Sequence, residues 1–397
     1  MYRMNPGGFM MSEMTSWQRV ETALQHKEPD RIPFDLGGSE VTGIHRCAYT
    51  RLREYLGLPQ RKVVIEDLSQ QLAKVDYDMQ ERLKIDVYPL NPGKPEGWEP
   101  HIETVGNYSR YIDEWGIHWY MPLGHGLYYD MRQHPLANID SIEELNNKYT
   151  FPDPVDPGRF AGMKEQAQNY RREGKAYILG RNAAGIFEMA LWLRGFENFY
   201  TDMIFNQKFA EYLLDKIMEV KWRYWEKALD EVGENVLVIS EADDLGSQKN
   251  GLISPELYRR LLKPRHTQLF NFIKKKAQRK VYIFYHCCGA IKELIPDLIE
   301  SGVDILNPVQ VSAKGMDTKE LKRLFGKDIT FWGGGVDTQN ILPDGTPQHV
   351  RDEVKRRIED LAPGGGFVFN TVHNIQGDVP PENIMAMWET LQEYGRY

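Results

Sequence analysis

The sequence has no run of 18 apolar residues, so no transmembrane helix is expected. Residues 1–14 also lack the apolar core of a signal peptide. We interpret Met1–Met14 as a flexible lead, or as the result of an early start codon, before a single domain over residues 15–397. The expected location is the cytoplasm, without membrane contact.

Cysteine is scarce, and charge of one sign is not concentrated anywhere. The three cysteines, Cys47, Cys287 and Cys288, are too few for a disulfide framework, and this fits a reducing compartment. The net charge is −8, and Lys and Arg are spread among Asp and Glu. A nucleic-acid partner is therefore not expected.

The chain also lacks the glycine motif of dinucleotide-binding sheets. No expected strand is followed by G-x-G-x-x-G, and the glycine runs 333–335 and 364–366 have neither that spacing nor the downstream acid. This absence counts against an open doubly wound sheet, which is the alternative fold.

What the sequence does contain is a regular alternation of short apolar strands and amphipathic helices. Such alternation predicts parallel βαβ units, and eight strands close a (β/α)8 TIM barrel. Thr15 and Gln18 form a capping box that begins an N-terminal helical extension. Residues 92–125, rich in Gly, Pro, Tyr and Trp, predict an inserted β-hairpin flap. The eight expected strands are 32–36, 86–90, 177–180, 236–241, 281–286, 303–307, 329–333 and 366–370.

Polar side chains gather at the ends of these apolar strands. The active sites of parallel barrels lie at the carboxyl ends of the strands, so these residues predict a catalytic or binding mouth. The set comprises Asp35, Arg181, Asn182, Glu241, Asp243, Asp244, His286, Cys288, Asn307, Gln310, Asp337, Asn370 and His373.

His286 and Cys288 are the most specific pair in this set. Alternate residues of an extended strand share a face, so the imidazole and the thiol converge while Cys287 points away. Imidazole and thiolate together suit Zn²⁺. The alternative is that two residues tolerant of apolar surroundings simply end a core strand.

The neighbouring acids leave several alternatives open. Asp243 and Asp244 fit acid–base chemistry, metal binding or capping of the following turn. Glu241 lies inside its strand and is the better carboxylate candidate for a metal. His373, taken alone, fits a loop histidine that caps the last helix.

Several motifs resemble those of the uroporphyrinogen decarboxylase superfamily from about residue 15 onward. They are Arg19-Val-x-x-Ala-Leu-x-x-Lys-Glu-Pro-Asp-Arg-Ile-Pro33, Asp113-Glu-Trp-Gly116, Leu252-Ile-Ser-Pro-Glu-Leu-Tyr258, His286-x-Cys-Gly289, and Asn370 through His373 to Asn383. The resemblance implies a (β/α)8 barrel, in agreement with the strand count.

The resemblance distinguishes two branches of that superfamily. True decarboxylases carry paired arginines after the first strand that grip the carboxylates of the tetrapyrrole. The corresponding stretch here, Leu36–Arg46, lacks the pair, which argues against uroporphyrinogen as substrate. Zinc- and corrinoid-dependent methyltransferases carry a His-x-Cys pair and a third Cys near the last strand. His286 and Cys288 match the pair, whereas the third position holds His373, as in the decarboxylases.

The resemblance therefore implies methyl transfer between a small molecule and a corrinoid. The substrate would be a methoxy compound, a methylamine-type donor or a thiol, with zinc as Lewis acid. No corrinoid-binding Asp-x-His-x-x-Gly stretch is present, so the corrinoid would come on a separate protein. Whether the chain forms a homodimer is left open. The expected metal ligands are His286, Cys288, His373 and Glu241; the catalytic residues Asp35, Asp243, Asp244 and Arg181; and the substrate-binding residues Asn182, Asn307, Gln310 and Asn370.

Two other functions remain open. One is a metal-free decarboxylase or lyase acting on a smaller acid, in which Asp35 or Asp243 handles protons and Arg181 holds a carboxylate. The other is a binder of corrinoid or tetrapyrrole without catalysis. Trp115 and Trp119 of the flap would cover a substrate, contact the partner, or simply pack within the hairpin.

Overall fold

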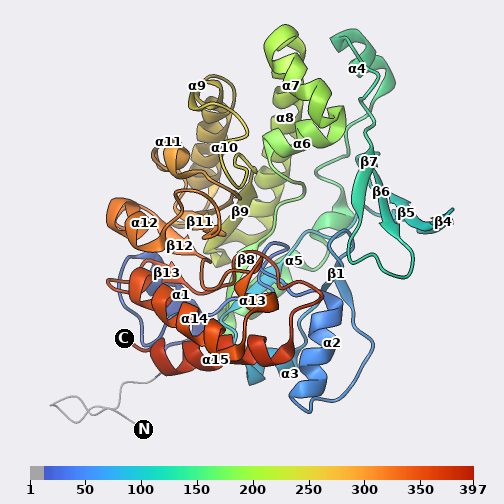
Figure 1. Ribbon diagram of the computed structural model, residues 1–397. Coiled ribbons are helices and arrows are strands. Elements are labelled where there is room, and N and C mark those ends of the chain that lie inside the picture. The colour runs from blue at the N-terminus through green and yellow to red at the C-terminus, as the bar shows by residue number, and fades with distance from the viewer. Residues whose placement is uncertain (1–12) are drawn as a thin grey trace.

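Seven parallel strands form a curved sheet in the computed structural model, which describes residues 13–397 (Figure 1). Helices cover its outer face, as βαβ connections require. The strands follow the order β3 (Val87–Leu90), β8 (Ala176–Leu179), β9 (Val238–Ala242), β10 (Tyr282–His286), β11 (Ile305–Asn307), β12 (Thr330–Trp332) and β13 (Phe367–Val368). Residues 1–12 of the expected flexible lead lie outside the described residues.

The segment 32–36 completes the barrel between the two outermost strands. Asp35 N donates to the carbonyl of Phe369 (2.9 Å) on one side, and Asp86 N donates to the carbonyl of Phe34 (2.8 Å) on the other. Within residues 32–36, Phe34 alone forms a β-bridge, with Phe369. Pro33 has no N–H, and the N–H of Phe34 bonds the Asp86 carboxylate (2.9 Å), so few groups remain for regular pairing. The expected (β/α)8 barrel is confirmed, with an irregular first strand.

Capping residues in the sequence mark where several helices begin. Thr15 and Gln18 form the expected capping box, and Ser254 caps the helix opened by Pro255. Three helices were not expected: α3, α7 and α13. Of these, α7 begins directly after Gly195 (φ +86°), which ends α6. The helices are α1 (Ser16–Leu24), α2 (Arg46–Tyr55), α3 (Tyr77–Arg82), α4 (Ile142–Lys148), α5 (Met163–Arg172), α6 (Ile186–Arg194), α7 (Phe196–Phe205), α8 (Gln207–Val232), α9 (Pro255–Leu257), α10 (Lys263–Lys276), α11 (Ile295–Ser301), α12 (Thr318–Phe325), α13 (Ile341–Asp344), α14 (Pro347–Leu361) and α15 (Pro381–Tyr394).

The flap is larger than the expected hairpin. It is a four-stranded antiparallel sheet of β4 (Glu103–Val105), β5 (Tyr108–Ile112), β6 (His118–Pro122) and β7 (Asp130–Gln133). β7 is mostly exposed and polar, so its sequence shows no apolar alternation and the expected boundary at residue 125 was too early. Figure 1 shows this sheet to one side of the barrel, near β1 (Ile65–Asp67), which pairs with β2 (Leu72–Ala73).

Aromatic side chains fill the barrel interior. Phe284 shares the inner face of β10 with His286 and meets Trp332 edge to face, with ring centroids 5.4 Å apart. Trp332 is fully buried. This packed interior leaves the polar residues at the strand ends as the place for chemistry. No helix between residues 13 and 397 combines the length and apolar character needed to span a bilayer.

Candidate active site

Two histidines and a cysteine meet at the carboxyl end of β10. The candidate ligand atoms of His286, Cys288 and His373 all lie within 4.8 Å of one another. Cys288 Sγ is 3.4 Å from Nε2 of His286, and the two imidazole rings meet edge to face with centroids 5.0 Å apart. We call these three residues the His–Cys–His cluster.

The ring of His286 is oriented by the next strand. Its Nδ1 lies 2.6 Å from Oδ1 of Asn307 on β11, and Asn307 Nδ2 donates to the carbonyl of Trp332 (2.8 Å). The second bond fixes which end of the amide faces the imidazole, so Nδ1 of His286 carries the proton. Nε2 therefore presents its lone pair to the cluster.

Burial keeps the cluster uncharged. It lowers the pKa of His286 to about 3, and together with the neighbouring His286 it lowers the pKa of His373. Burial and the nearby Asp244 raise the pKa of the Cys288 thiol. His373 has a left-handed backbone (φ +70°), and its Nδ1 accepts the N–H of Asn374 (2.8 Å). Neutral imidazoles offer a lone pair to a divalent cation directly, and such a cation displaces the proton of the thiol.

Asp243 and Asp244 diverge in spite of being adjacent. Asp244 lines the cavity, and its Oδ1 accepts the N–H of Cys288 (2.8 Å) and lies 3.8 Å from Nε2 of His286. Asp243 is fully buried; it bonds Nε2 of His266 (2.8 Å) and accepts the N–H of Glu188 (2.8 Å) at the start of α6. Asp243 thus holds a helix terminus, and only Asp244 adjoins the cluster.

Glu241 faces away from the cluster. Ser240 points into the barrel, where its Oγ accepts a hydrogen bond from Nη1 of Arg181 (2.7 Å). Successive residues of a strand point to opposite faces, so Glu241 points outward. Glu241 there pairs with Lys221 on α8 (2.9 Å) and also accepts the indole N–H of Trp225. Both of its oxygens are occupied, and we leave Glu241 out of the metal set that the sequence suggested.

Arg181 and Asn182, which follow β8, both line the cavity. Arg181 forms an ion pair with Glu40 (2.8 Å) from the loop after the first strand. Oδ1 of Asn182 is shielded from solvent and has no hydrogen-bond donor within residues 13–397. These two positions remain candidates for contact with a substrate.

The other expected site residues lie behind the cavity wall. Asp35 is fully buried, accepts from Nε1 of Trp332 (2.9 Å) and from Gly38 N (2.9 Å), and burial raises its pKa to about 7. Asn370 donates to the carbonyl of Asp35 (3.0 Å), and Gln310 accepts from Gly289 N (2.7 Å). Asp337 accepts the N–H of Gln339 (2.8 Å) in its own turn. None of the four lines the cavity, so they support its walls.

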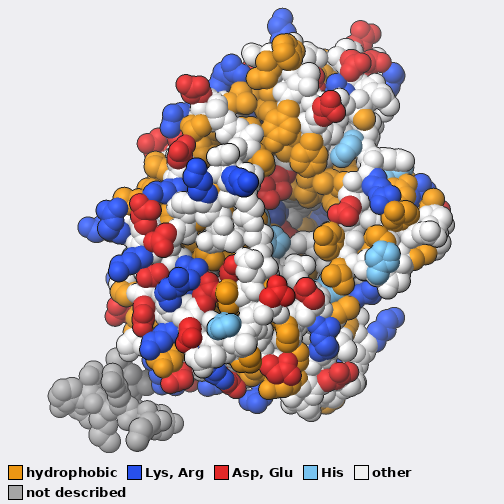
Figure 2. All heavy atoms as spheres, viewed as in Figure 1, with side chains coloured by type: hydrophobic (Ala, Val, Ile, Leu, Met, Phe, Trp, Pro, Cys, Tyr) orange, Lys and Arg blue, Asp and Glu red, His pale blue; other side chains and the backbone are white. Residues whose placement is uncertain are grey.

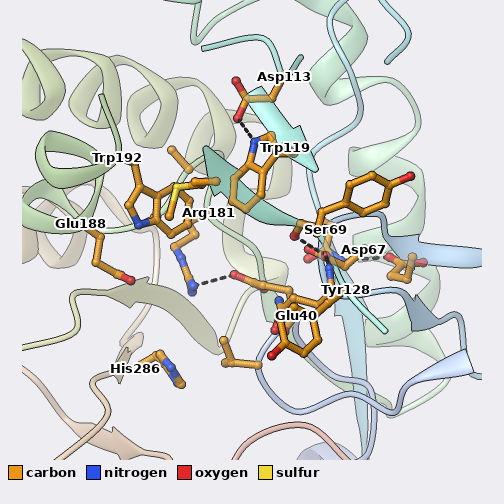
Figure 3. A pocket seen from close by; sticks show the side chains of 18 of the residues that line it. Glu40, Asp67, Ser69, Asp113, Trp119, Tyr128, Arg181, Glu188, Trp192 and His286 are labelled. Atoms are coloured by element: carbon orange, nitrogen blue, oxygen red, sulfur yellow. Dashed lines mark hydrogen bonds and ion pairs between the residues drawn. The ribbon is translucent and has the colours of Figure 1, made fainter. Parts of the chain in front are cut away.

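The cavity above the cluster has a volume of about 730 Å³. Figure 2 shows it as a hollow with acidic and histidine side chains at its edge and apolar side chains beside it. Figure 3 shows Trp119 of the flap, Glu188 and Trp192 of α6, and Glu40 around Arg181, with His286 below. The cavity is lined by Glu40, Val41, Glu66, Asp67, Ser69, Gln70, Asn91, Pro92, Tyr111, Asp113, Trp119, Tyr128, Tyr129, Met131, Arg181, Asn182, Ala183, Ala184, Glu188, Trp192, Asp244, His286, His373 and Gln376.

The sequence interpretation missed most of this lining. Glu188 and Trp192 are one helical turn apart directly after the Arg181–Asn182 strand end, and that spacing was a usable signal. Of the two flap tryptophans, Trp119 lines the cavity, whereas Trp115 packs edge to face on Phe151 (6.3 Å). Of the three roles considered for these tryptophans, the position of Trp119 fits covering a substrate and that of Trp115 fits packing.

A closed barrel with polar side chains and a cavity at the carboxyl ends of its strands is the architecture of a (β/α)8-barrel enzyme. Within that class, the chain belongs to the uroporphyrinogen decarboxylase (URO-D) family, whose profile matches residues 117–394. The superfamily resemblance noted in the sequence is confirmed.

Individual relatives are distant. A uroporphyrinogen decarboxylase of Thermus thermophilus is 27% identical over 186 residues, which cover 46% of this chain and 48% of the relative, so the chain spans about half the length of that protein. A uroporphyrinogen decarboxylase of Pseudoalteromonas translucida is 25% identical over 285 residues, or 68% and 75% of the two chains. A methyltransferase from Methanosarcina mazei has a similar fold, with a TM-score of 0.64 and 19% identity over 96% of this chain and 99% of that one.

Proposed function

We propose that this protein is a methyltransferase that holds a zinc ion at the His–Cys–His cluster. It moves a methyl group between a small molecule and a corrinoid carried by a partner protein. The observation that carries the proposal is the approach of three ligand atoms from His286, Cys288 and His373 to within 4.8 Å beneath a substrate-sized cavity. The full-length fold similarity to a methyltransferase supports it.

The donor set fits zinc. Two imidazoles and one thiolate are three protein ligands, which is the pattern of catalytic zinc sites that keep one position open. Zinc bound there would act as a Lewis acid on a substrate oxygen or sulfur. Asn307 orients the His286 ring, and Asp244 holds the backbone of Cys288.

The cavity does not suit a porphyrinogen. Among the described residues, its lining includes six carboxylates and a single cation, Arg181, which is already paired with Glu40. A substrate with many carboxylates needs a cationic surface for binding. The acidic cavity thus favours methyl transfer over decarboxylation of uroporphyrinogen.

A second candidate is a metal-free decarboxylase or lyase for another acid. Arg181 on the cavity wall favours it, since a guanidinium can hold a carboxylate once it leaves Glu40. Asp35 has a pKa near 7, suited to proton transfer, but it lies behind the wall.

Metal analysis and two activity assays decide between these candidates. We expect one zinc per chain in the purified protein, together with loss of methyl from methylcobalamin when thiols are offered as acceptors, followed in the visible spectrum. A protein without zinc that releases CO₂ from small carboxylic acids would establish the second candidate instead.

A further inference from the structure

Carboxylates dominate the charged side chains of the cavity. The acids are Glu40, Glu66, Asp67, Asp113, Glu188 and Asp244, and Arg181 is the cation among the lining residues. Arg181 is taken by Glu40 at 2.8 Å. Within residues 13–397, none of the other five acids forms an ion pair with Lys or Arg. The cavity therefore holds more carboxyl groups than cations, and burial without a cationic partner raises the pKa of Asp67, Asp113 and Glu188.

The hydrogen bonds to these acids come from neutral donors. Asp113 accepts the N–H groups of Trp115 and Ile117 and the indole of Trp119. Asp67 accepts from Ser69 and from the N–H of Gln70. The Glu188 carboxyl group, at the first turn of α6, has a hydrogen bond from the backbone of Gly185. Neutral donors orient carboxylates without cancelling their charge, and partly buried charge of this kind is costly unless a cation joins it.

Aromatic rings line the same cavity. Trp119 and Trp192 stand perpendicular, with centroids 5.6 Å apart and an interplanar angle of 88°, and so form a corner. The bond from Trp119 Nε1 to Asp113 (2.8 Å) fixes one wall of this corner. Trp192 lies one helical turn after Glu188, so the second wall stands beside a carboxyl group that has no Lys or Arg partner within residues 13–397 (Figure 3). Tyr111, Tyr128 and Tyr129 add further rings to the lining.

We infer that this cavity binds an organic cation, with an alkylated ammonium group in the Trp119–Trp192 corner beside Glu188. Aromatic faces attract ammonium groups through the ring quadrupole, and nearby carboxylates add to this attraction. A cavity of about 730 Å³ has room for an additional arm that reaches the His–Cys–His cluster. Burial raises the pKa of Asp113 to about 6, because it disfavours the charged form of the carboxyl group. A cation bound nearby would stabilise that charged form.

The inference rests on the proposed function only in taking this cavity as the substrate site. It narrows the substrate to a molecule with a cationic nitrogen at one end. The reacting oxygen or sulfur would lie at the other end, next to the cluster.

Calorimetry with three matched probes tests it. The probes are choline, its neutral isostere with a tert-butyl group in place of the trimethylammonium group, and the anion isethionate. We expect choline to bind at least tenfold more tightly than the neutral isostere, and isethionate to bind more weakly than either. Equal binding of choline and its isostere, or preference for isethionate, overturns the inference.

Substitutions test whether choline binds in the Trp119–Trp192 corner. Trp192→Leu and Glu188→Gln should each weaken choline binding by about tenfold. Trp388→Leu and Glu256→Gln, outside the cavity lining, should leave it unchanged. Circular dichroism confirms that each variant is folded, and the isosteric Glu188→Gln variant provides the test should Trp192→Leu unfold. Choline binding that is unaffected by a folded Glu188→Gln or Trp192→Leu variant overturns the location.

Choline binding by zinc-free protein tests this inference independently of the proposed function. Choline selectivity in a Cys288→Ala variant supports the cation site even if wild-type protein contains no zinc. Zinc-loaded wild-type protein without choline selectivity overturns the cation site while the metal proposal stands.

Discussion

Asn307 Oδ1 lies 2.6 Å from Nδ1 of His286, across the β10–β11 pair. This contact sets the tautomer of the imidazole, and its removal should weaken metal binding. We expect Asn307→Leu to lower zinc affinity by about 10- to 100-fold, measured by competition with a chromophoric chelator. Asn383→Leu removes another buried amide, bonded to Leu342 and Gly345, and should leave zinc affinity unchanged. Equal affinities for wild type and Asn307→Leu would contradict this role.

The adjacent cysteines provide a matched pair for metal content. Cys288 belongs to the His–Cys–His cluster, whereas Cys287 is fully buried and outside it. Cys288→Ala should reduce zinc to near zero per chain, because two imidazoles alone bind zinc weakly. Cys287→Ala should retain zinc and lose only stability. The measurement is elemental analysis of gel-filtered protein, and comparable zinc in both variants would refute the assignment.

His373 should be a weaker ligand than His286. Its Nδ1 accepts the N–H of Asn374, so in the neutral ring the proton lies on Nε2. For Nε2 to coordinate, the ring must move its proton to Nδ1, and Nδ1 then loses the hydrogen bond from Asn374. We expect His286→Ala to lower zinc affinity more than His373→Ala in the same chelator competition. The reverse order would show that His373 binds through a different arrangement.

The Lys221–Glu241 pair should govern stability and not metal content. Both side chains are buried, and Glu241 accepts from Lys221 at 2.9 Å. Glu241→Gln leaves a buried ammonium without its partner and should cost about 3–5 kcal/mol of unfolding free energy. Urea denaturation measures this loss. Zinc content of the folded variant should stay at the wild-type level, and a loss of zinc would return Glu241 to the ligand set.

Asp35 should give the stability of the protein a distinct pH dependence. Its pKa rises from 3.8 to about 7 in the folded state because of burial. Between about pH 4 and 7 the folded chain therefore binds more protons than the unfolded chain, and unfolding free energy falls as pH rises. The contribution is up to about 1.4 kcal/mol per pH unit. Asp35→Asn should lose this slope in urea titrations across that range; an unchanged slope would contradict it.

The local parts of the fold were predictable from the sequence. The convergence of His286 and Cys288 follows from strand periodicity over three residues, and the Thr15–Gln18 capping box lies within one helical turn. Which residues of β9 point into the barrel was not predictable in the same way. Strands of a parallel sheet are buried on both faces, so apolar pattern alone does not tell Ser240 from Glu241. Tertiary contact with Arg181 and Lys221 decides it.

The cavity lining was the least predictable part. Glu40, Asp113 and Glu188 come from a barrel loop, the flap and a helix, and only the closed fold brings them together. Asp243 shows the same limit, because its neighbour Asp244 has an identical side chain but a different role. Asp243 Oδ2 accepts from Nε2 of His266, 23 positions away, so its carboxylate points away from that of Asp244.

The segment 32–36, which completes the barrel, constrains when the barrel can close during synthesis. Phe34 and Asp35 pair with Phe369, more than 300 positions later, and Ile32 N bonds the carbonyl of Gly395 (2.7 Å). While the ribosome is still making the intervening chain, the first strand has no partner on that side. The barrel therefore closes only after β13 has emerged, and until then the nascent protein exposes an unpaired strand that chaperones or aggregation can engage.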